Sequence, residues 1–507
     1  MLSIINSSNL IGIDSILIKV EVDITNGIPA FNIVGLPSIE IKESRERIKS
    51  AIMNSNFKFP NSRIIVNLSP ADIRKEGSFF DLPICIGILR EHIKKSNTYL
   101  EESVFVGEIS LNGDIKKVRG ILPIIIGAKE NKIKRVFIPK ENLNESKLIK
   151  DIEIIPVNSL NETIDYINGK LKINNMVNKY SINKTNEINK EDMSDIKGNY
   201  FAKRGLEIAA AGNHNILMIG PPGSGKTMLA KRLKTIMPKL SEEEHIEISK
   251  IYSISGLLNE DIGTMQERPF RAPHHTSTKQ AIIGGGSDVK PGEITLAHKG
   301  VLFLDEVGEF NKSILETLRQ PIEDKYINIA RVKQSLKYPS DILLVASMNP
   351  CPCGYYLSEK ECKCKPYEIN RYINKISGPL LDRFDMVVEV NQVKYDELQQ
   401  NIKGEESKKI KYRVEKAREL QEKRFEYRHK SNNDLEGDEI MKYCNLDTNS
   451  KNLLKQLFEK YKLSNRNYYK LLKLSRTIAD LEGSENILEE HLLEGFSYRK
   501  AYYRYFG

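Results

Sequence analysis

The chain has 507 residues, 40% of them hydrophobic and 29% charged, with a formal net charge of +9 and a pI near 8.9. This composition is typical of a globular protein of about two to four domains, and no run approaches the roughly 18 apolar residues of a membrane span, so we expect no membrane partner. Six cysteines, four of them between 351 and 364, do not resemble a secreted disulfide framework and indicate a reducing, cytoplasmic location. The basic excess fits a nucleic-acid partner without identifying one.

The first predicted elements belong to a mixed α/β domain over residues 1–170. Strand patterns occupy 16–22 and 63–68, and a helical pattern occupies 39–54. A domain of this kind has enough apolar residues to bury its own core.

Three further regions follow in chain order. Residues 171–194 are polar and low in complexity, with too few apolar side chains to pack, which predicts a flexible linker. Strand and helix patterns alternate over 195–393, as in an α/β sheet domain. Residues 394–507 are almost wholly helical in pattern.

A glycine-rich loop stands between an apolar strand pattern at 216–219 and a helical pattern at 228–236. In this setting backbone N–H groups surround a phosphate at a helix N-terminus, which predicts a site for a nucleoside triphosphate such as ATP. Lys226 is expected to reach the β- and γ-phosphates and the Thr227 hydroxyl to hold Mg²⁺. The predicted loop residues are Gly220, Pro221, Pro222, Gly223, Ser224, Gly225, Lys226 and Thr227.

Polar side chains also end two further predicted strands. The apolar run 301–304 leads into Asp305 and Glu306. We expect Asp305 to complete the Mg²⁺ shell and Glu306 to polarise the attacking water. A third apolar run, 342–346, precedes Asn349, whose amide is suited to orienting that water beside the γ-phosphate.

Arg383 precedes the strand pattern at 386–390 and is a candidate arginine finger, supplied to the ATP of a neighbouring subunit. The alternative is an ordinary surface ion pair, which is far weaker.

Four cysteines lie within 14 positions as two Cys-x-Cys pairs. Four thiolates suit a structural Zn²⁺, although the usual ribbon spacing is Cys-x₂₋₄-Cys. Bound zinc and simple reduced thiols therefore both stay open. The candidate ligands are Cys351, Cys353, Cys362 and Cys364.

The chain contains four longer strings, FNIVGLP at 31–37, RPFRAPHHT at 268–276, PGEITLAH at 291–298 and NPCPCGY at 349–355. Together with the motifs above, they resemble the magnesium-chelatase-like branch of the AAA+ ATPases, and within it the YifB/ComM family, over nearly the whole chain. The resemblance implies an AAA+ P-loop core over 195–393 and a helical lid over 394–507. It also implies that Arg383 is the finger and Arg466 the second sensor arginine, with Arg476 the less favoured choice for that sensor.

In related AAA+ rings, a hairpin before the first sensor points into the central pore. The pattern over 327–337, apolar residues flanking a basic tip, is typical of such a hairpin. Arg331 and Lys333 are therefore candidates for contacts with a DNA backbone. A solvated hairpin without ligand is the alternative for either residue.

The N-terminal domain, 1–170, contains the strings KEGSFFDLP at 75–83, VGEISLNG at 106–113 and IPKEN at 138–142. With these strings it resembles the Lon-protease fold, which is related to the α/β fold of ribosomal protein S5. Peptide hydrolysis there needs a serine activated by a lysine. The resemblance puts Phe79 at the serine position and Leu122 near the lysine position, with Ser78 one place away. We therefore expect this domain to be non-proteolytic.

The resemblance implies an ATP-driven motor that acts on single-stranded or branched DNA as a homo-oligomer, a ring-shaped hexamer. Unwinding or branch migration during recombination or natural transformation is the expected activity. Two alternatives remain open, a motor subunit of a magnesium chelatase and a protein unfoldase or chaperone.

Overall fold

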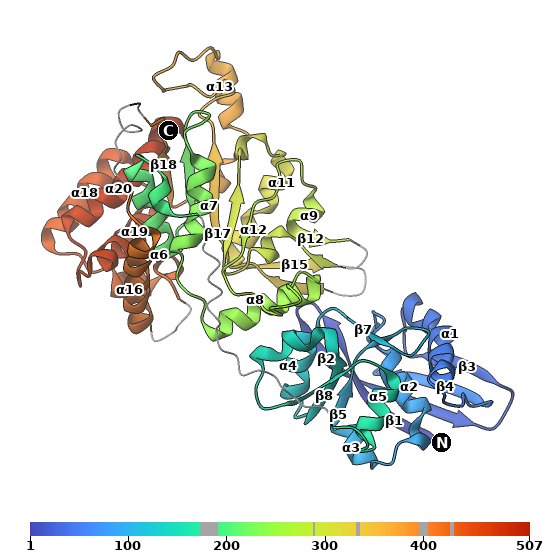
Figure 1. Cartoon of the computed structure of the whole chain (residues 1–507). Coiled ribbons are helices and arrows are strands. Elements are labelled where there is room, and N and C mark those ends of the chain that lie inside the picture. The colour runs from blue at the N-terminus through green and yellow to red at the C-terminus, as the bar shows by residue number, and fades with distance from the viewer. Residues whose placement is uncertain are drawn as a thin grey trace. The chain divides into compact units, whose positions relative to one another are not determined.

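The structure is a computed structural model that describes residues 1–172, 191–286, 289–330, 335–393, 395, 404–425 and 430–506. These residues form two compact units, drawn together in Figure 1. The first unit holds residues 1–172 together with Glu242–Gln266, and the second holds the remaining described residues. The linker predicted for 171–194 lies largely outside the described residues.

The first unit is built on a mixed seven-stranded sheet with the strand order β3-β4-β2-β1-β5-β8-β9. Its strand β2 buries Ile18, Val20 and Val22 and exposes Lys19, the alternation that the sequence predicts. A small separate ribbon pairs β6 (Glu108–Ile109) with β7 (Ile115–Lys116). The strands of the main sheet are β1 (Leu2–Ile11), β2 (Asp14–Thr25), β3 (Ala30–Val34), β4 (Arg63–Ser69), β5 (Ser103–Phe105), β8 (Arg135–Pro139) and β9 (Glu153–Val157).

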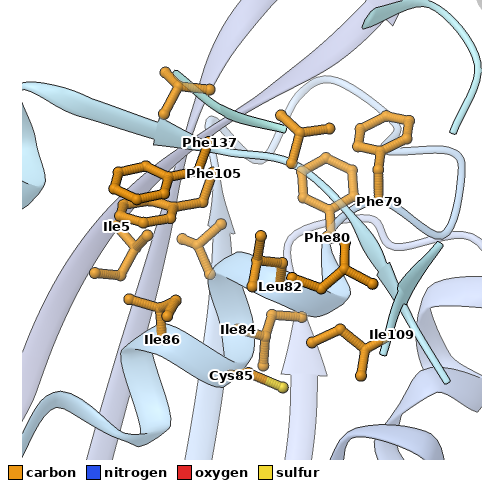
Figure 2. Packing of buried hydrophobic residues seen from close by; sticks show 14 of the residues in the cluster. Ile5, Phe79, Phe80, Leu82, Ile84, Cys85, Ile86, Phe105, Ile109 and Phe137 are labelled. Atoms are coloured by element: carbon orange, nitrogen blue, oxygen red, sulfur yellow. The ribbon is translucent and has the colours of Figure 1, made fainter. Parts of the chain in front are cut away.

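The core of the first unit lies between this sheet and its helices, and Figure 2 shows part of it. The rings of Phe105 and Phe137 stack with centroids 4.4 Å apart, above the fully buried helix α2. Phe79 is buried beside Phe80 in the same cluster. The helices of this unit are α1 (Ile39–Asn54), α2 (Asp81–Ile88), α3 (Asn97–Glu101), α4 (Ile121–Glu130), α5 (Leu160–Ile167) and α8 (Glu242–Ser255).

Helix α8 belongs to the first unit although the chain reaches it only after the phosphate loop. The Ser253 hydroxyl donates to the Glu145 carboxylate at 2.5 Å, and the Ser253 carbonyl accepts from the Gly120 N–H at 3.1 Å. Burial raises the pKa of Glu145. The sequence pattern had placed this segment within 195–393, so the compact units and the predicted domains divide the chain differently.

The second unit is built on a parallel sheet with the order β11-β14-β17-β10-β18. Two antiparallel hairpins, β12–β13 and β15–β16, stand outside it. The strands are β10 (Ile216–Ile219), β11 (Phe270–Arg271), β12 (Gly284–Gly285), β13 (Lys290–Pro291), β14 (Val301–Leu304), β15 (Tyr326–Ala330), β16 (Ser335–Pro339), β17 (Leu343–Met348) and β18 (Met386–Glu389).

Apolar residues cover both faces of this sheet, as a buried parallel sheet requires. Ile216 and Met218 pack with helices α6 and α7 in one cluster, whereas Leu217 and Ile219 pack with α11 and α14 in another. Figure 1 shows α6 and α7 on one side of β17 and α11 and α12 on the other. The helices are α6 (Tyr200–Gly212), α7 (Lys226–Ile236), α9 (Lys279–Ile283), α10 (Glu293–Leu296), α11 (Lys312–Thr317), α12 (Arg319–Asp324), α13 (Pro366–Ile373) and α14 (Gly378–Leu381).

The C-terminal part of the second unit is helical, as the sequence predicts. Within the part of the chain that the structure describes, no helix combines the length and apolar character needed to cross a bilayer. The mixed α/β class is thus confirmed, while the Lon-like type of the first unit and the lid role of these helices stay predictions. The helices are α16 (Ser407–Phe425), α17 (Asp438–Tyr443), α18 (Thr448–Tyr461), α19 (Asn465–Glu482) and α20 (Glu489–Phe506).

His214 joins the sheet to helix α19 and makes stability depend on pH. Its Nε2 lies 2.7 Å from the Thr477 hydroxyl, and burial lowers the pKa of His214 to about 4. His214 takes up a proton near pH 6.5 in the unfolded chain but only near pH 4 in the folded chain. Between these pH values the free energy of unfolding therefore falls by about 1 kcal/mol for each pH unit of acidification.

We therefore expect urea unfolding of the wild-type protein at pH 7, 6 and 5 to show this loss. The His214→Gln variant serves as the reference, because it lacks the titrating group. Equal pH slopes for the two proteins would exclude His214 as the cause.

Candidate nucleotide site

The predicted phosphate loop lies at the carboxyl end of strand β10 and leads into helix α7. Gly223 and Gly225 have φ angles of 74° and 92°, in the left-handed region that glycine adopts at low cost. The Lys226 ammonium folds back over the loop and donates to the carbonyls of Gly220, at 2.7 Å, and Pro221, at 2.9 Å. The loop therefore curls around the lysine nitrogen at the end of the sheet.

Residues at the ends of strands β14 and β17 meet this loop. The Thr227 hydroxyl donates to Asp305 Oδ2 at 2.9 Å, and Lys226 Nζ lies 3.3 Å from Asn349 Oδ1. Asp305 Oδ1 also accepts from the Ser347 hydroxyl and from the Glu306 N–H. The ends of β10, β14 and β17 thus bring together a cation, a hydroxyl, two carboxylates and an amide.

The chemistry of this group suits a phosphate and a divalent cation. Lys226 is only 9% exposed, and desolvation lowers its pKa to about 8, while the charges of Asp305 and Glu306 oppose that shift. The buried Ser224 hydroxyl has no hydrogen-bond partner among the described residues. Hydroxyl and carboxylate oxygens, as on Thr227 and Asp305, are the protein ligands that Mg²⁺ prefers.

A cavity of about 760 Å³ lies at the same end of the sheet, between the start of α6, the end of β18 and helix α20. Asn199 connects it to the phosphate loop, because its Nδ2 lies 3.4 Å from the Ser224 carbonyl oxygen. Tyr200 is 69% exposed on the cavity wall, and Phe201 stacks on Tyr498 with centroids 4.4 Å apart. The cavity therefore offers aromatic surfaces next to the loop, as a nucleobase would require.

Arg383 and Arg466 lie at the opposite end of the sheet. Arg383 precedes Met386, and Met386 pairs with Ile216 at the start of β10, whereas the phosphate loop follows Ile219. Four strand residues, about 13 Å, therefore separate the two ends. The carboxylate of Glu323 accepts a hydrogen bond from Arg383 Nη2 and lies 3.7 Å from Arg466 Nη2.

Arg476, the less favoured candidate for the second sensor, is fully buried in a different environment. Its guanidinium donates to Asp480 Oδ1 at 3.0 Å and to the carbonyl of Glu485 at 2.6 Å. These contacts lie within α19 and the connection from α19 to α20.

The four clustered cysteines converge in space between β17 and α13. Their sulfur atoms lie within 4.8 Å of one another, and Cys351 Sγ lies 3.4 Å from Cys353 Sγ and 3.7 Å from Cys362 Sγ. A tetrahedral zinc site with Zn–S bonds of about 2.3 Å places its sulfurs about 3.8 Å apart, so the four thiols fit zinc. Cys364 completes the set and accepts from the Cys353 N–H at 3.4 Å.

The cysteine cluster adjoins the phosphate loop. Cys351 follows Asn349 by two positions, and a Cβ atom added at Gly354 would lie 2.5 Å from Pro222 Cδ. The backbone at Gly354 therefore approaches the loop as closely as a glycine permits.

The two strands of the predicted hairpin are present as β15 paired with β16, from Tyr326 opposite Pro339 to Ala330 opposite Ser335. Its predicted DNA contacts, Arg331 and Lys333, lie outside the described residues.

Known protein families and individual proteins match this chain over nearly its whole length. Family models described as magnesium chelatase, subunit ChlI, as subunit ChlI of Mg-chelatase, and as the ChlI C-terminal part match residues 192–398, 20–142 and 404–499. The competence protein ComM of Haemophilus influenzae is 41% identical, and the alignment covers 98% of this chain and 97% of that protein. The chain belongs to the YifB/ComM family of magnesium-chelatase-like AAA+ proteins.

Other members of the YifB/ComM family match over the same length. YifB of Escherichia coli is 39% identical, with 98% of this chain and 97% of that protein covered. A Mycobacterium tuberculosis protein, Rv2897c, is 34% identical, with 97% of both chains covered. The family resemblance that the sequence motifs indicated is thus confirmed.

Sequence patterns missed two residues described above, Ser347 and Glu323. Ser347, which bonds Asp305, stands two positions before Asn349, where strand alternation could have indicated it. Glu323 carries no local motif, and only the fold brings it beside Arg383 and Arg466.

Proposed function

We propose that this protein hydrolyses ATP and uses the energy to act on DNA as a ring of identical subunits, a hexamer. The observation that carries the proposal is the convergence of Lys226, Thr227, Asp305 and Asn349 at one end of a parallel sheet. In this proposal Lys226 binds the β- and γ-phosphates, Thr227 and Asp305 hold Mg²⁺, and Glu306 orients the attacking water.

The position of Arg383 supports the oligomer in this proposal. An arginine finger must reach the γ-phosphate, and Arg383 lies at the far end of the sheet from the loop of its own chain. A neighbouring subunit would therefore receive Arg383, and Arg466 with it. The base of the nucleotide would occupy the cavity beside Asn199 and Tyr200.

DNA is the proposed substrate for two reasons. The net charge is positive and the sequence between β15 and β16 contains Arg331 and Lys333. The Haemophilus relative is named a competence protein. Unwinding or branch migration of recombination intermediates is the activity that the family resemblance implies.

The deciding experiment is steady-state ATP hydrolysis with and without single-stranded, duplex and four-way-junction DNA. We expect DNA to stimulate hydrolysis, and most strongly the single-stranded or branched forms. Stimulation by a porphyrin with chelatase partner subunits would favour a chelatase motor instead, and stimulation by an unfolded protein would favour an unfoldase. Indifference to every DNA would contradict the proposed substrate.

We further propose that Cys351, Cys353, Cys362 and Cys364 hold a structural Zn²⁺. Metal analysis of the purified protein is expected to find about one zinc per chain, and Cys362→Ser to lose most of it, because three thiolates leave the tetrahedron incomplete. Cys444→Ser, which removes a buried thiol far along the chain from the cluster, serves as the control. Unchanged zinc in Cys362→Ser would exclude the site.

A further inference from the structure

Two arginines contact one exposed glutamate at the end of the second unit's sheet that lies away from the phosphate loop, and the charge of a third arginine acts on one of them. Arg319 begins α12, Arg383 lies before β18, and Arg466 is in the first turn of α19. Glu323, on α12, contacts both Arg383 and Arg466. One carboxylate therefore pairs with two guanidinium groups that come from distant parts of the chain.

Positive charge exceeds negative charge in this cluster. Burial and the neighbouring positive charges of Arg466 and Arg319 lower the pKa of Arg383, while Glu323 opposes that shift. Arg319 pairs with a carboxylate of its own, that of Glu316, at 2.8 Å. The cluster is therefore suited to bind a further anion.

Two hydrogen-bond donors without partners also favour the binding of an anion at this cluster. The Arg383 side chain is 10% exposed, and its buried Nε has no partner among the described residues. The Nε of Arg319 is buried without a partner as well. Planar guanidinium groups with free donors match the oxygens of a phosphate.

The C-terminal helices fix the loop that carries Arg383. Lys470 of α19 donates to the Phe384 carbonyl at 2.9 Å and pairs with Asp385 at 3.3 Å. Arg499 of α20 donates to the Asp385 carbonyl at 3.1 Å. The backbone on the C-terminal side of Arg383 is thus held in place, whereas the contacts of its guanidinium tip with exposed Glu323 can exchange.

We propose that Glu323 is a latch that occupies Arg383 and Arg466 in place of the terminal phosphate of ATP held by a second copy of this chain. This inference rests on the proposed function. Glu323 is 54% exposed, and exposed ion pairs are weak, so a phosphate with several negative oxygens displaces the carboxylate. Arg319 then provides the third positive charge beside that phosphate.

The test mixes two inactive variants of the full chain. Lys226→Ala cannot bind its own phosphates but keeps its arginines, and Arg383→Ala keeps its nucleotide site but lacks the finger. When Lys226→Ala is titrated into a fixed amount of Arg383→Ala with ATP and Mg²⁺, phosphate release should appear. Adding Glu323→Gln to the Lys226→Ala chain is expected to lower the half-maximal concentration by about three- to tenfold, as the loss of two exposed ion pairs allows.

The matched control is Asp324→Asn in the Lys226→Ala chain. Asp324 is the next residue on the same helix, is exposed, and has no ion-pair partner among the described residues. The Asp324→Asn substitution removes the same negative charge but leaves Glu323 and its two arginine contacts intact. The concentration of the Lys226→Ala chain that gives half-maximal phosphate release should therefore not change. Glu323→Ala must shift that concentration in the same direction as Glu323→Gln.

The possible outcomes distinguish a failure of the latch proposal from a failure of the proposed function on which it rests. No phosphate release from any mixture would contradict the shared site between copies. Release that Glu323→Gln leaves unchanged would overturn the latch alone. A lower saturating rate with Glu323→Gln would also overturn it, because Glu323 would then hold the arginines in their active position.

Discussion

Replacing Arg383 with alanine is expected to slow steady-state ATP hydrolysis by at least about 10³-fold, the range found for arginine fingers. The reason is that its guanidinium would stabilise the charge that develops on the γ-phosphate in the neighbouring subunit. Phosphate release at saturating ATP, with the assembled state checked by light scattering, measures the effect. Arg383→Lys keeps the charge but loses the planar donors, so it should recover only a small part of the rate.

Folding is the main alternative explanation for such a loss. Glu323, the ion-pair partner of Arg383, is exposed, so Arg383→Ala leaves no unpaired charge in the protein interior. The thermal midpoint of Arg383→Ala should therefore stay close to that of the wild-type protein. A rate within tenfold of wild type in an assembled sample would contradict the finger role.

Glu306→Gln is expected to reduce hydrolysis by about 10²- to 10⁴-fold while ATP still binds, because glutamine cannot accept the proton of the attacking water. Glu306 has a φ of 51°, and its N–H donates to Asp305 Oδ1 at 3.1 Å, which fixes the backbone at the end of β14. Phosphate release and the affinity for a fluorescent ATP analogue measure the two properties separately.

Glu309→Gln is the matched control for this substitution. Glu309 lies in the same short 3₁₀ turn, and its carboxylate is 3.7 Å from Lys375. Its neutralisation should leave both hydrolysis and binding nearly unchanged. Equal losses in the two variants would assign the effect to the turn rather than to the chemistry of Glu306.

Local sequence rules predicted much of the nucleotide site. The loop 220–227 is contiguous, and glycine, lysine and threonine at fixed spacing act within one strand-loop-helix unit. Asp305 and Asn349 were predicted for a related reason, since parallel strands end at the same edge of a sheet. The structure brings these residues together, while their roles in hydrolysis remain proposals.

Other features depend on contacts between distant segments, which no local pattern encodes. The sequence pattern gave no indication that α8 packs in the first unit, where Ser253 contacts Glu145, 108 positions away. The Cys-x-Cys spacing left zinc and reduced thiols equally open, and only the fold of the connecting loop shows that the four sulfur atoms converge.

The sequence by itself determined the family, the phosphate loop and the strand ends that face it, because periodicity, glycine conformation and motif spacing act over a few residues. Only the tertiary structure decided that Arg383 and Arg466 lie at the opposite end of the sheet and share Glu323. The physical reason is that side chains 60 to 143 positions apart meet only when helices α12 and α19 pack beside the start of β18. The long-range packing of the core determines these contacts, and the local propensities of the three residues do not.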